Sequence, residues 1–344
     1  MLEIQHGTAK SRVLHMAAAL LAVTLGCAAP PAIGSAQPAT GAANRSQHVR
    51  TLKITVLVTN LAGDPHEGDG EWGYSALVEM DGHKLLYDTG SSADMVLKNA
   101  RAMKIDLSDV EDVVLSHNHS DHVGGLMALR TEFAKINPRA FSRVHVGGRI
   151  FEPRLDQAGQ DHNGLLLIKA QYLATGGVFV VHDKPSELYP GVWFTGPVPR
   201  PNPEKNWNPG LSLVTAQGRV EDNVPEDSAM LIETDGGTVI LTGCGHAGIV
   251  NITEYARTIA GNQPVAALVG GLHLFAASDQ TLAWTGAKLK SYEVQSLLAG
   301  HCTGIEATYR LRESLGLTRR TAVVSTVRSS FTLGQGINPR LLAQ

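Results

Sequence analysis

The stretch VVLSHNHSDHVGGL, residues 113–126, joins an apolar run to four potential metal ligands: His117, His119, Asp121 and His122. Because residues two apart on an extended segment point the same way, His117 and His119 can close on one ion. Asp121 and His122 follow on the turn and can reach a second ion beside it. Imidazole and carboxylate together favour zinc, iron or manganese over calcium or magnesium. The stretch therefore predicts a metal site.

The composition is that of a globular protein with a large core. The chain has 344 residues, of which 43% are hydrophobic and 18% charged, and this length allows one large domain or two modest ones. The net charge of −3 and the absence of a clustered Lys/Arg stripe argue against a nucleic-acid partner. Aromatic residues make up only 5%, which argues against a base-stacking platform.

The N-terminus is typical of an export signal. Two basic residues precede an apolar run over residues 13–26, and prolines and small residues follow. The run is too short for a comfortable membrane span, so we expect a signal peptide over residues 1–36 and a periplasmic or secreted protein without stable membrane insertion. A lipid anchor at Cys27 and an uncleaved N-terminal anchor are alternatives. Residues 37–50 have the composition of a disordered lead-in.

From residue 51 to residue 344 the sequence alternates strand and helix patterns and predicts a single domain. Strand patterns cover residues 52–59, 74–80, 84–87, 110–115, 226–241 as a hairpin, 265–269, 294–299 and 322–327. Helix patterns cover a segment that Ser91 or Ser92 caps and that ends near Met103, and residues 125–136, 249–260 and 305–315. The middle, residues 137–223, is less regular. Two hairpin-rich halves interleaved with helices predict an α/β fold of two sheets packed face to face with helices outside.

Three further predicted strand ends carry histidine or cysteine beside glycines: Thr242–His246, Gly300–Gly304 and Gly270–Leu274. A catalytic metal site takes its ligands from several strand ends, and three such ends are hard to explain by structure alone. For His273 taken alone, a buried structural histidine is an equally good interpretation.

The HxHxDH motif, His117 to His122, resembles the signature of the metallo-β-lactamase fold superfamily. The resemblance extends over nearly all of residues 52–335. One branch is especially similar, the group related to the archaeal dihydropterin-aminobenzene-phosphate synthase of methanopterin biosynthesis, whose members are mostly unassigned metal-dependent hydrolase-like proteins. The motifs that match this branch are Glu71–Ser75, Leu86–Gly90, Asn99–Ala100, Leu115–Leu126, Thr195–Arg200, Asp227–Ala229, Leu241–His246, Gly270–Leu274 and His301–Gly304.

The resemblance implies an αβ/βα four-layer sandwich with a dinuclear metal site at one edge, holding two divalent ions. Zinc is expected, with iron or manganese as alternatives. By resemblance, the first metal would be held by His117 and His119, and the second by Asp121, His122 and His301. Cys244 would occupy the position of the bridging aspartate of most relatives. One histidine of the relatives is missing; Asp227, or else Asp222, is expected to replace it, and a site with one tightly held metal is the alternative.

Several further residues are candidates for supporting roles. Asp88 is expected to orient a ligand rather than to touch metal. His246, His273 and Arg200 are candidates for positions around the ligands or the substrate, and His246 and Arg200 could meet an anionic group or serve local structure. The glycine-rich loop over residues 61–73 could cover the site or be a solvated loop.

The two cysteines that remain after signal removal, Cys244 and Cys302, both lie beside expected ligands. In an oxidising compartment they could form a disulfide instead of binding metal. Both alternatives are open at the level of sequence.

The motif and the resemblance together predict a metal-dependent hydrolase. Metal-bound hydroxide, oriented by Asp121 as the catalytic residue, would attack an ester, lactone, phosphoester or β-lactam bond of a small-molecule substrate. A dihydropterin/ribofuranosylaminobenzene phosphate synthase-like transferase is one alternative, although export argues against it because those substrates are cytoplasmic. An iron-dependent oxidoreductase on the same fold and a non-catalytic metal-binding protein are the others.

Overall fold

The computed structural model describes residues 48–207 and 209–344. The predicted signal peptide, residues 1–36, and the lead-in up to residue 47 lie outside the described residues. The last part of the expected lead-in is ordered, contrary to expectation, because Val49 is buried and its N–H donates to the carbonyl of Glu233 at 2.8 Å. Within the described part of the chain, no helix is both long and apolar enough to cross a membrane.

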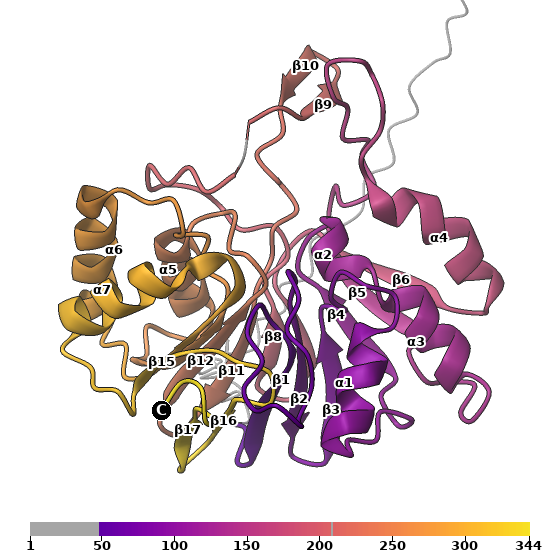
Figure 1. Ribbon diagram of the computed structural model, residues 1–344. Helices are drawn as coiled ribbons and strands as arrows, with labels where there is room; N and C mark the ends of the chain where they lie inside the picture. The colour runs from indigo at the N-terminus through magenta and orange to yellow at the C-terminus, as the bar shows by residue number, and fades with distance from the viewer. Residues whose placement is uncertain (1–47, 208) are drawn as a thin grey trace, which may run out of the picture. The chain divides into compact units, whose positions relative to one another are not determined.

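The first sheet has eight strands in the order β17-β16-β1-β2-β3-β4-β5-β6 (Figure 1). Their bounds are Leu52–Val58 for β1, Ser75–Met80 for β2, His83–Tyr87 for β3, Asp112–Leu115 for β4, Arg143–Gly147 for β5, Val178–His182 for β6, Ser330–Thr332 for β16 and Gly336–Asn338 for β17. The run from β3 to β6 is parallel, and the other pairs are antiparallel.

The second sheet has seven strands in the order β15-β14-β13-β12-β11-β8-β7. Their bounds are Ser186–Tyr189 for β7, Val192–Phe194 for β8, Met230–Thr234 for β11, Gly237–Thr242 for β12, Val265–Gly270 for β13, Leu297–Ala299 for β14 and Ala322–Val324 for β15. The run from β12 to β15 is parallel. A separate hairpin pairs β9, Ser212–Thr215, with β10, Gly218–Glu221.

Helices cover the outer face of each sheet (Figure 1). Their bounds are Met95–Met103 for α1, Ser120–Val123 for α2, Leu126–Phe133 for α3, Gly164–Ala174 for α4, Ile249–Ile259 for α5, Asp279–Ser291 for α6 and Ile305–Leu315 for α7. The strand period of two explains the layering: along β12, Val239 and Leu241 enter the core between the sheets, whereas Ile240 packs outward with the helices. The structure confirms the expected α/β four-layer sandwich.

Some expectations for single elements were wrong. Neither Ser91 nor Ser92 caps α1, because the helix begins only at Met95 and Asp94 holds the N-cap position. The backbone N–H groups of both serines donate to the carboxylate of Glu71 at 3.0 and 3.1 Å. The middle of the chain, expected to be irregular, contains β5 to β10 and α4. Helix α4 was missed because its apolar residues are spread around the helix and give no amphipathic period. Helix α6 and strands β16 and β17 were also not predicted.

Candidate metal centre

The carboxyl ends of four parallel strands carry the expected ligands to one edge of the sandwich. The residues that follow these strands are His117 and His119 after β4, Cys244 and His246 after β12, His273 after β13 and His301 after β14. Within each sheet the carboxyl ends of parallel strands lie at one edge, which is where α/β proteins place their sites, and these two edges adjoin, because donors from both lie within 4.8 Å of one another. The structure thus brings together side chains that are up to 184 positions apart in the sequence, from 117 to 301.

A first donor set consists of three histidines. One ring nitrogen of each of His117, His119 and His246 lies within 4.8 Å of the others. The ring centroids of His117 and His119 are 4.5 Å apart, and each lies 4.7 Å from that of His246. Three imidazoles at this spacing are a ligand set that zinc accepts readily.

A second donor set consists of Asp121, His122 and His301. Oδ2 of Asp121 lies 3.2 Å from Nε2 of His301 and 3.7 Å from Nε2 of His122, and the two Nε2 atoms are 3.3 Å apart. These are the three residues that the resemblance implies for a second metal.

Cys244 lies between the two sets. Its sulfur is 3.2 Å from Nε2 of His122 and also groups with His117 of the first set and with His301 of the second. By the resemblance, Cys244 takes the position expected between two ions, and the structure puts its sulfur within reach of donors on both sides. Burial raises the pKa of the Cys244 thiol, and a bound metal would deprotonate it.

Hydrogen bonds at Nδ1 turn the Nε2 atoms of four histidines toward the centre. Nδ1 of His122 donates to Asp88 at 2.7 Å, that of His246 to the carbonyl of Asn206 at 2.5 Å, and that of His301 to Asn60 at 3.2 Å. Nδ1 of the fourth, His117, donates to the hydroxyl of Ser116 at 2.9 Å. Metal-binding histidines fix their tautomer in this way.

The donor sets fit metal ions because two buried nitrogens lack another partner. Nε2 of His117 and Nε2 of His246 are buried without a hydrogen-bond partner among the described residues, an arrangement that is costly unless an ion takes the lone pair. Burial, reinforced by neighbouring histidines, holds the pKa of both residues well below the usual value. Both therefore present neutral imidazole, the form that binds metal.

In the second set, nearby carboxylates determine the protonation of His122. Burial alone would lower the pKa of His122, but Asp121 and Asp88 outweigh it and raise that pKa to about 9. Burial would likewise raise the pKa of Asp121, but His122 and His301 outweigh it and lower that pKa. A metal bound here would displace a proton from His122.

Asp88 lies behind the ligands and touches two of the segments that carry them. Its carboxylate accepts from the backbone N–H of Ser116 at 2.8 Å, from the Ser116 hydroxyl at 2.7 Å and from His122. Through Ser116 it also orients His117. Gly243 makes room for this network, because a Cβ there would lie 2.1 Å from the Ser116 hydroxyl oxygen and 2.5 Å from Oδ2 of Asp88.

The expected substitutes for the missing histidine lie elsewhere. Asp227 belongs to none of the donor groups, and its carboxylate accepts from the N–H of Ala247 at 2.8 Å. Asp222 forms an ion pair with the buried Arg154 at 3.0 Å. His246 completes the first set instead. A signal was present, because Cys244 and His246 repeat the two-residue spacing of His117 and His119.

The other candidate residues from the sequence, together with Cys302, lie around the donor sets and contact different parts of them. His273 groups with Cys244 and His246, with its ring centroid 4.4 Å from that of His246. Cys302 is a free thiol, as is Cys244, and contacts the carbonyl of Cys244 at 3.6 Å. Two nitrogens of Arg200 donate to the backbone carbonyls of His246 and Val224, so this side chain is engaged in holding the segment that carries His246.

The loop over residues 61–73 reaches the centre at its end. The exposed ring of Trp72 lies 5.0 Å, centroid to centroid, from the ring of His301. The preceding Glu71 fixes this end of the loop to the turn before α1, because its carboxylate accepts from the N–H groups of Ser91 and Ser92.

Comparison with known proteins identifies the class. A family model described as the metallo-beta-lactamase superfamily matches residues 70–140, which include the HxHxDH motif. A solved metal-dependent hydrolase of the beta-lactamase superfamily superposes with a TM-score of 0.61 at 27% identity, covering 77% of this chain and 93% of that one. The metallo-beta-lactamase fold protein YhfI from Bacillus subtilis superposes with a TM-score of 0.52 at 15% identity, covering 82% and 99%, and shows the fold alone.

The chain belongs to the metallo-β-lactamase superfamily. Within it, the chain is similar to the 7,8-dihydropterin-6-methyl-4-(beta-D-ribofuranosyl)-aminobenzene-5'-phosphate synthase of Methanocaldococcus jannaschii. The two are 31% identical over 268 residues, which are 75% of this chain and 90% of that relative. The similarity to this branch inferred from the sequence motifs is thus confirmed.

Proposed function

We propose that this protein is a hydrolase that holds two divalent metal ions, with zinc as the first candidate, and cleaves an ester, lactone or phosphoester-type bond. The observation that carries the proposal is the arrangement of two donor sets around the sulfur of Cys244. The family, in which the metal-dependent hydrolase above superposes over most of the chain, supports the same reading.

The residues would divide the work as follows. His117, His119 and His246 would hold one ion and Asp121, His122 and His301 the other, with Cys244 between them. When bound, divalent ions supply a Lewis acid and make water acidic enough to attack near neutral pH.

Asp121 is the residue that we assign to the reacting groups. Its side chain retains some exposure, 16%, whereas the side chains of His122 and His301 have none. Because its pKa is lowered, it is ionised and can accept a hydrogen bond from the attacking water and so orient it.

The test combines metal analysis with two variants. The purified mature protein should contain close to two zinc ions per chain and hydrolyse members of a panel of lactones, phosphodiesters and esters. His119→Ala and Asp121→Ala should each lower kcat at least about 100-fold while melting like wild type after metal removal. His162→Ala, which changes an exposed histidine paired with Asp156, serves as the matched control.

Retained turnover in both variants with metal still bound would refute this assignment. One iron per chain would instead favour redox chemistry, with oxygen uptake as the next assay.

A transferase resembling the named synthase is the second candidate, since that relative is 31% identical over most of its length. We also propose export, on the basis of residues 1–36, which would separate the protein from cytoplasmic pterin substrates. The mass of the mature protein from a cell fractionation tests export: a full-length cytoplasmic chain would favour the synthase reading.

A further inference from the structure

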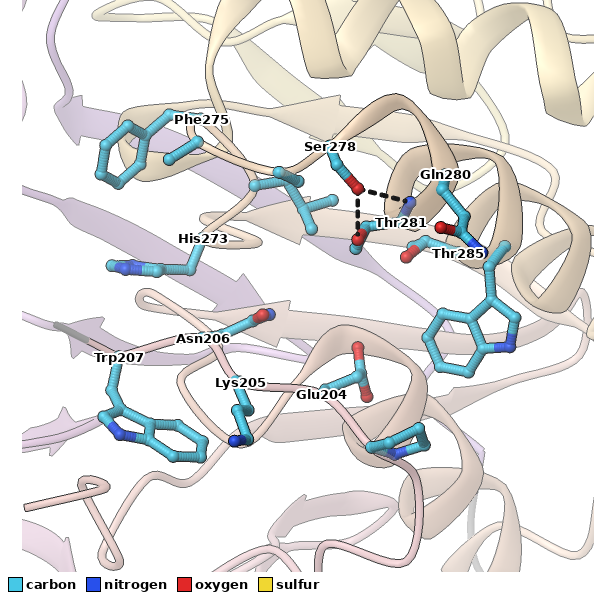
Figure 2. Close-up of a pocket in the computed structure, with 15 residues that line it drawn as sticks. Glu204, Lys205, Asn206, Trp207, His273, Phe275, Ser278, Gln280, Thr281 and Thr285 are labelled. Carbon is cyan, nitrogen blue, oxygen red and sulfur yellow. Dashed lines mark hydrogen bonds between the residues drawn. The ribbon is translucent and has the colours of Figure 1, made fainter. Parts of the chain in front are cut away.

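A cavity of about 560 Å³ opens beside the metal centre. One wall is the loop Pro203–Trp207, and the other is the segment His273–Thr285, which includes the start of α6 (Figure 2). His273 belongs to both places, because it lines the cavity and its ring contacts that of His246. The volume suits a small organic molecule, and such sites are usually few in a protein.

The cavity gathers aromatic rings in a chain that has few. Trp207, Trp284 and Phe275 line it, and Trp72 contacts Phe275 with ring centroids 6.3 Å apart. Three of the four tryptophans of the sequence are thus at this place. The rings of His246, His273, Phe275, Trp72 and His301 contact one another in that order, with centroids 4.4 to 6.3 Å apart. They form a continuous series of ring contacts from one donor set to the other, and two of the rings, His273 and Phe275, line the cavity.

Two buried polar groups in the cavity wall lack a partner. Nδ2 of Asn206 and the hydroxyl of Thr285 have no hydrogen-bond partner among the described residues, although the residues are only 8% and 1% exposed. In Figure 2 the Asn206 amide points from its loop toward the side of the cavity formed by α6. The backbone carbonyl of Asn206 accepts from Nδ1 of His246, so the backbone of this residue is held next to the metal centre. An orphan amide donor in this position calls for an acceptor on a ligand.

The charged groups of the wall are occupied or peripheral. The carboxylate of Glu204 accepts from the N–H groups of Val250 and Asn251 at the start of α5, at 3.1 and 2.8 Å. Lys205 is exposed. Recognition inside the cavity therefore depends on ring contacts and neutral hydrogen bonds rather than on a salt bridge.

We propose that this cavity binds a planar aromatic or heteroaromatic ring bearing a hydrogen-bond acceptor, such as a ring carbonyl or amide. The ring would stack on the aromatic lining and its acceptor would take the hydrogen bond of the Asn206 amide. That this ring is the part of the substrate joined to the cleaved group rests on the proposed function; that the cavity binds such a ring does not.

The test measures binding without turnover. The full mature chain is titrated by calorimetry with 2-naphthamide and with its saturated analogue decahydro-2-naphthamide, which keeps the amide but has no π-face. Stacking is worth about 1 kcal/mol beyond buried area, so we expect about fivefold or greater preference for 2-naphthamide. Equal affinity for the two probes, or no binding of either at millimolar concentration, would overturn the proposal.

Three variants locate the ring. Phe275→Leu and Asn206→Leu should each weaken 2-naphthamide at least about fivefold, whereas Tyr309→Leu, at an exposed aromatic on α7, should leave its affinity unchanged. Far-ultraviolet circular dichroism and metal content show that each variant is folded and loaded. If all three variants bind the probe alike, the cavity assigned here is not its site.

The outcome separates this inference from the proposed function. Ring-selective binding without hydrolysis of any panel substrate would sustain the cavity and refute the hydrolase. Hydrolysis of aryl and cyclohexyl esters of one acid with equal KM would support the hydrolase and refute the ring-binding role of the cavity. If both proposals hold, Phe275→Leu should raise KM for the aryl ester more than it lowers kcat.

Discussion

Replacing Asp88 by asparagine should weaken metal binding by the second donor set while leaving the fold in place. The carboxylate of Asp88 only accepts hydrogen bonds, and it takes three: two from Ser116 and one from Nδ1 of His122. An amide of the same shape has one accepting and one donating end. If the oxygen faces the backbone N–H of Ser116, the introduced NH₂ group meets the N–H of His122, and if the amide turns over, it meets the N–H of Ser116.

The protein can avoid this donor–donor clash only by a tautomer change of His122, and that change weakens metal binding. Moving the His122 proton from Nδ1 to Nε2 removes the clash, but Nε2 is the atom that lies 3.2 Å from the Cys244 sulfur and 3.3 Å from Nε2 of His301. A protonated Nε2 cannot coordinate an ion. Loss of an orienting partner of this kind typically costs 10- to 100-fold in metal affinity, or about 1.4 to 2.7 kcal/mol. One unsatisfied buried donor costs about 1 to 3 kcal/mol of stability.

The assay is a zinc competition titration against a chromogenic chelator, followed by urea unfolding of the metal-free protein. We expect one of the two sites in Asp88→Asn to weaken by 10- to 100-fold, and nitrogen chemical shifts of the histidines to report a changed tautomer of His122. Asp81→Asn is the matched control, because Asp81 also accepts from backbone N–H groups, those of Arg50 and Thr51, but lies far from the centre. Wild-type zinc affinity at both sites of Asp88→Asn would refute the reasoning.

Three further perturbations test other parts of the structure. His246→Ala should reduce the zinc content from about two ions to about one per chain in metal analysis, with His162→Ala unchanged, because it removes one of three donors of the first set. Gly243→Ala should lower the free energy of unfolding by about 1 to 3 kcal/mol, since its Cβ would overlap the Ser116 hydroxyl, whereas Gly164→Ala, with open space around it, should not; equal melting of the two variants would contradict the packing described. Burial raises the pKa of Glu204 from 4.5 to about 7, so the folded state keeps the proton longer than the unfolded chain and stability should fall as pH rises from about 4.5 to about 7, by on the order of 3 kcal/mol. Glu204→Gln should flatten this slope in urea titrations at several pH values.

The local part of the site could be predicted from the sequence. The spacing of His117, His119, Asp121 and His122 depends only on an extended segment and the turn after it, so short-range geometry decides it. The same holds for α7, predicted and observed over Ile305–Leu315. The strand ends that carry Cys244, His273 and His301 were also recognisable, because each combines an apolar run with glycines.

The non-local part could not be predicted in the same way. Whether His246 or Asp227 completes the first set depends on which backbone groups each one meets after the sheets pack, and Asp227 instead accepts from the N–H of Ala247. The cavity could not be predicted for the same reason, because Asn206 and Trp207 lie between β8 and β9 and meet α6 only in the folded protein.

The donors that group around Cys244 come from both sheets of the sandwich, His117 and His122 from the segment after β4 and His301 from the segment after β14. The first donor set therefore needs residues of both halves of the chain, and the second set is complete only when His301, in the last quarter, has folded onto the first half. An ion bound by donors from both halves would stabilise the folded protein only, because the donors are not together before the two sheets have packed. Chains starved of metal should consequently open along the seam between the sheets before either half unravels, and proteases would meet them there first.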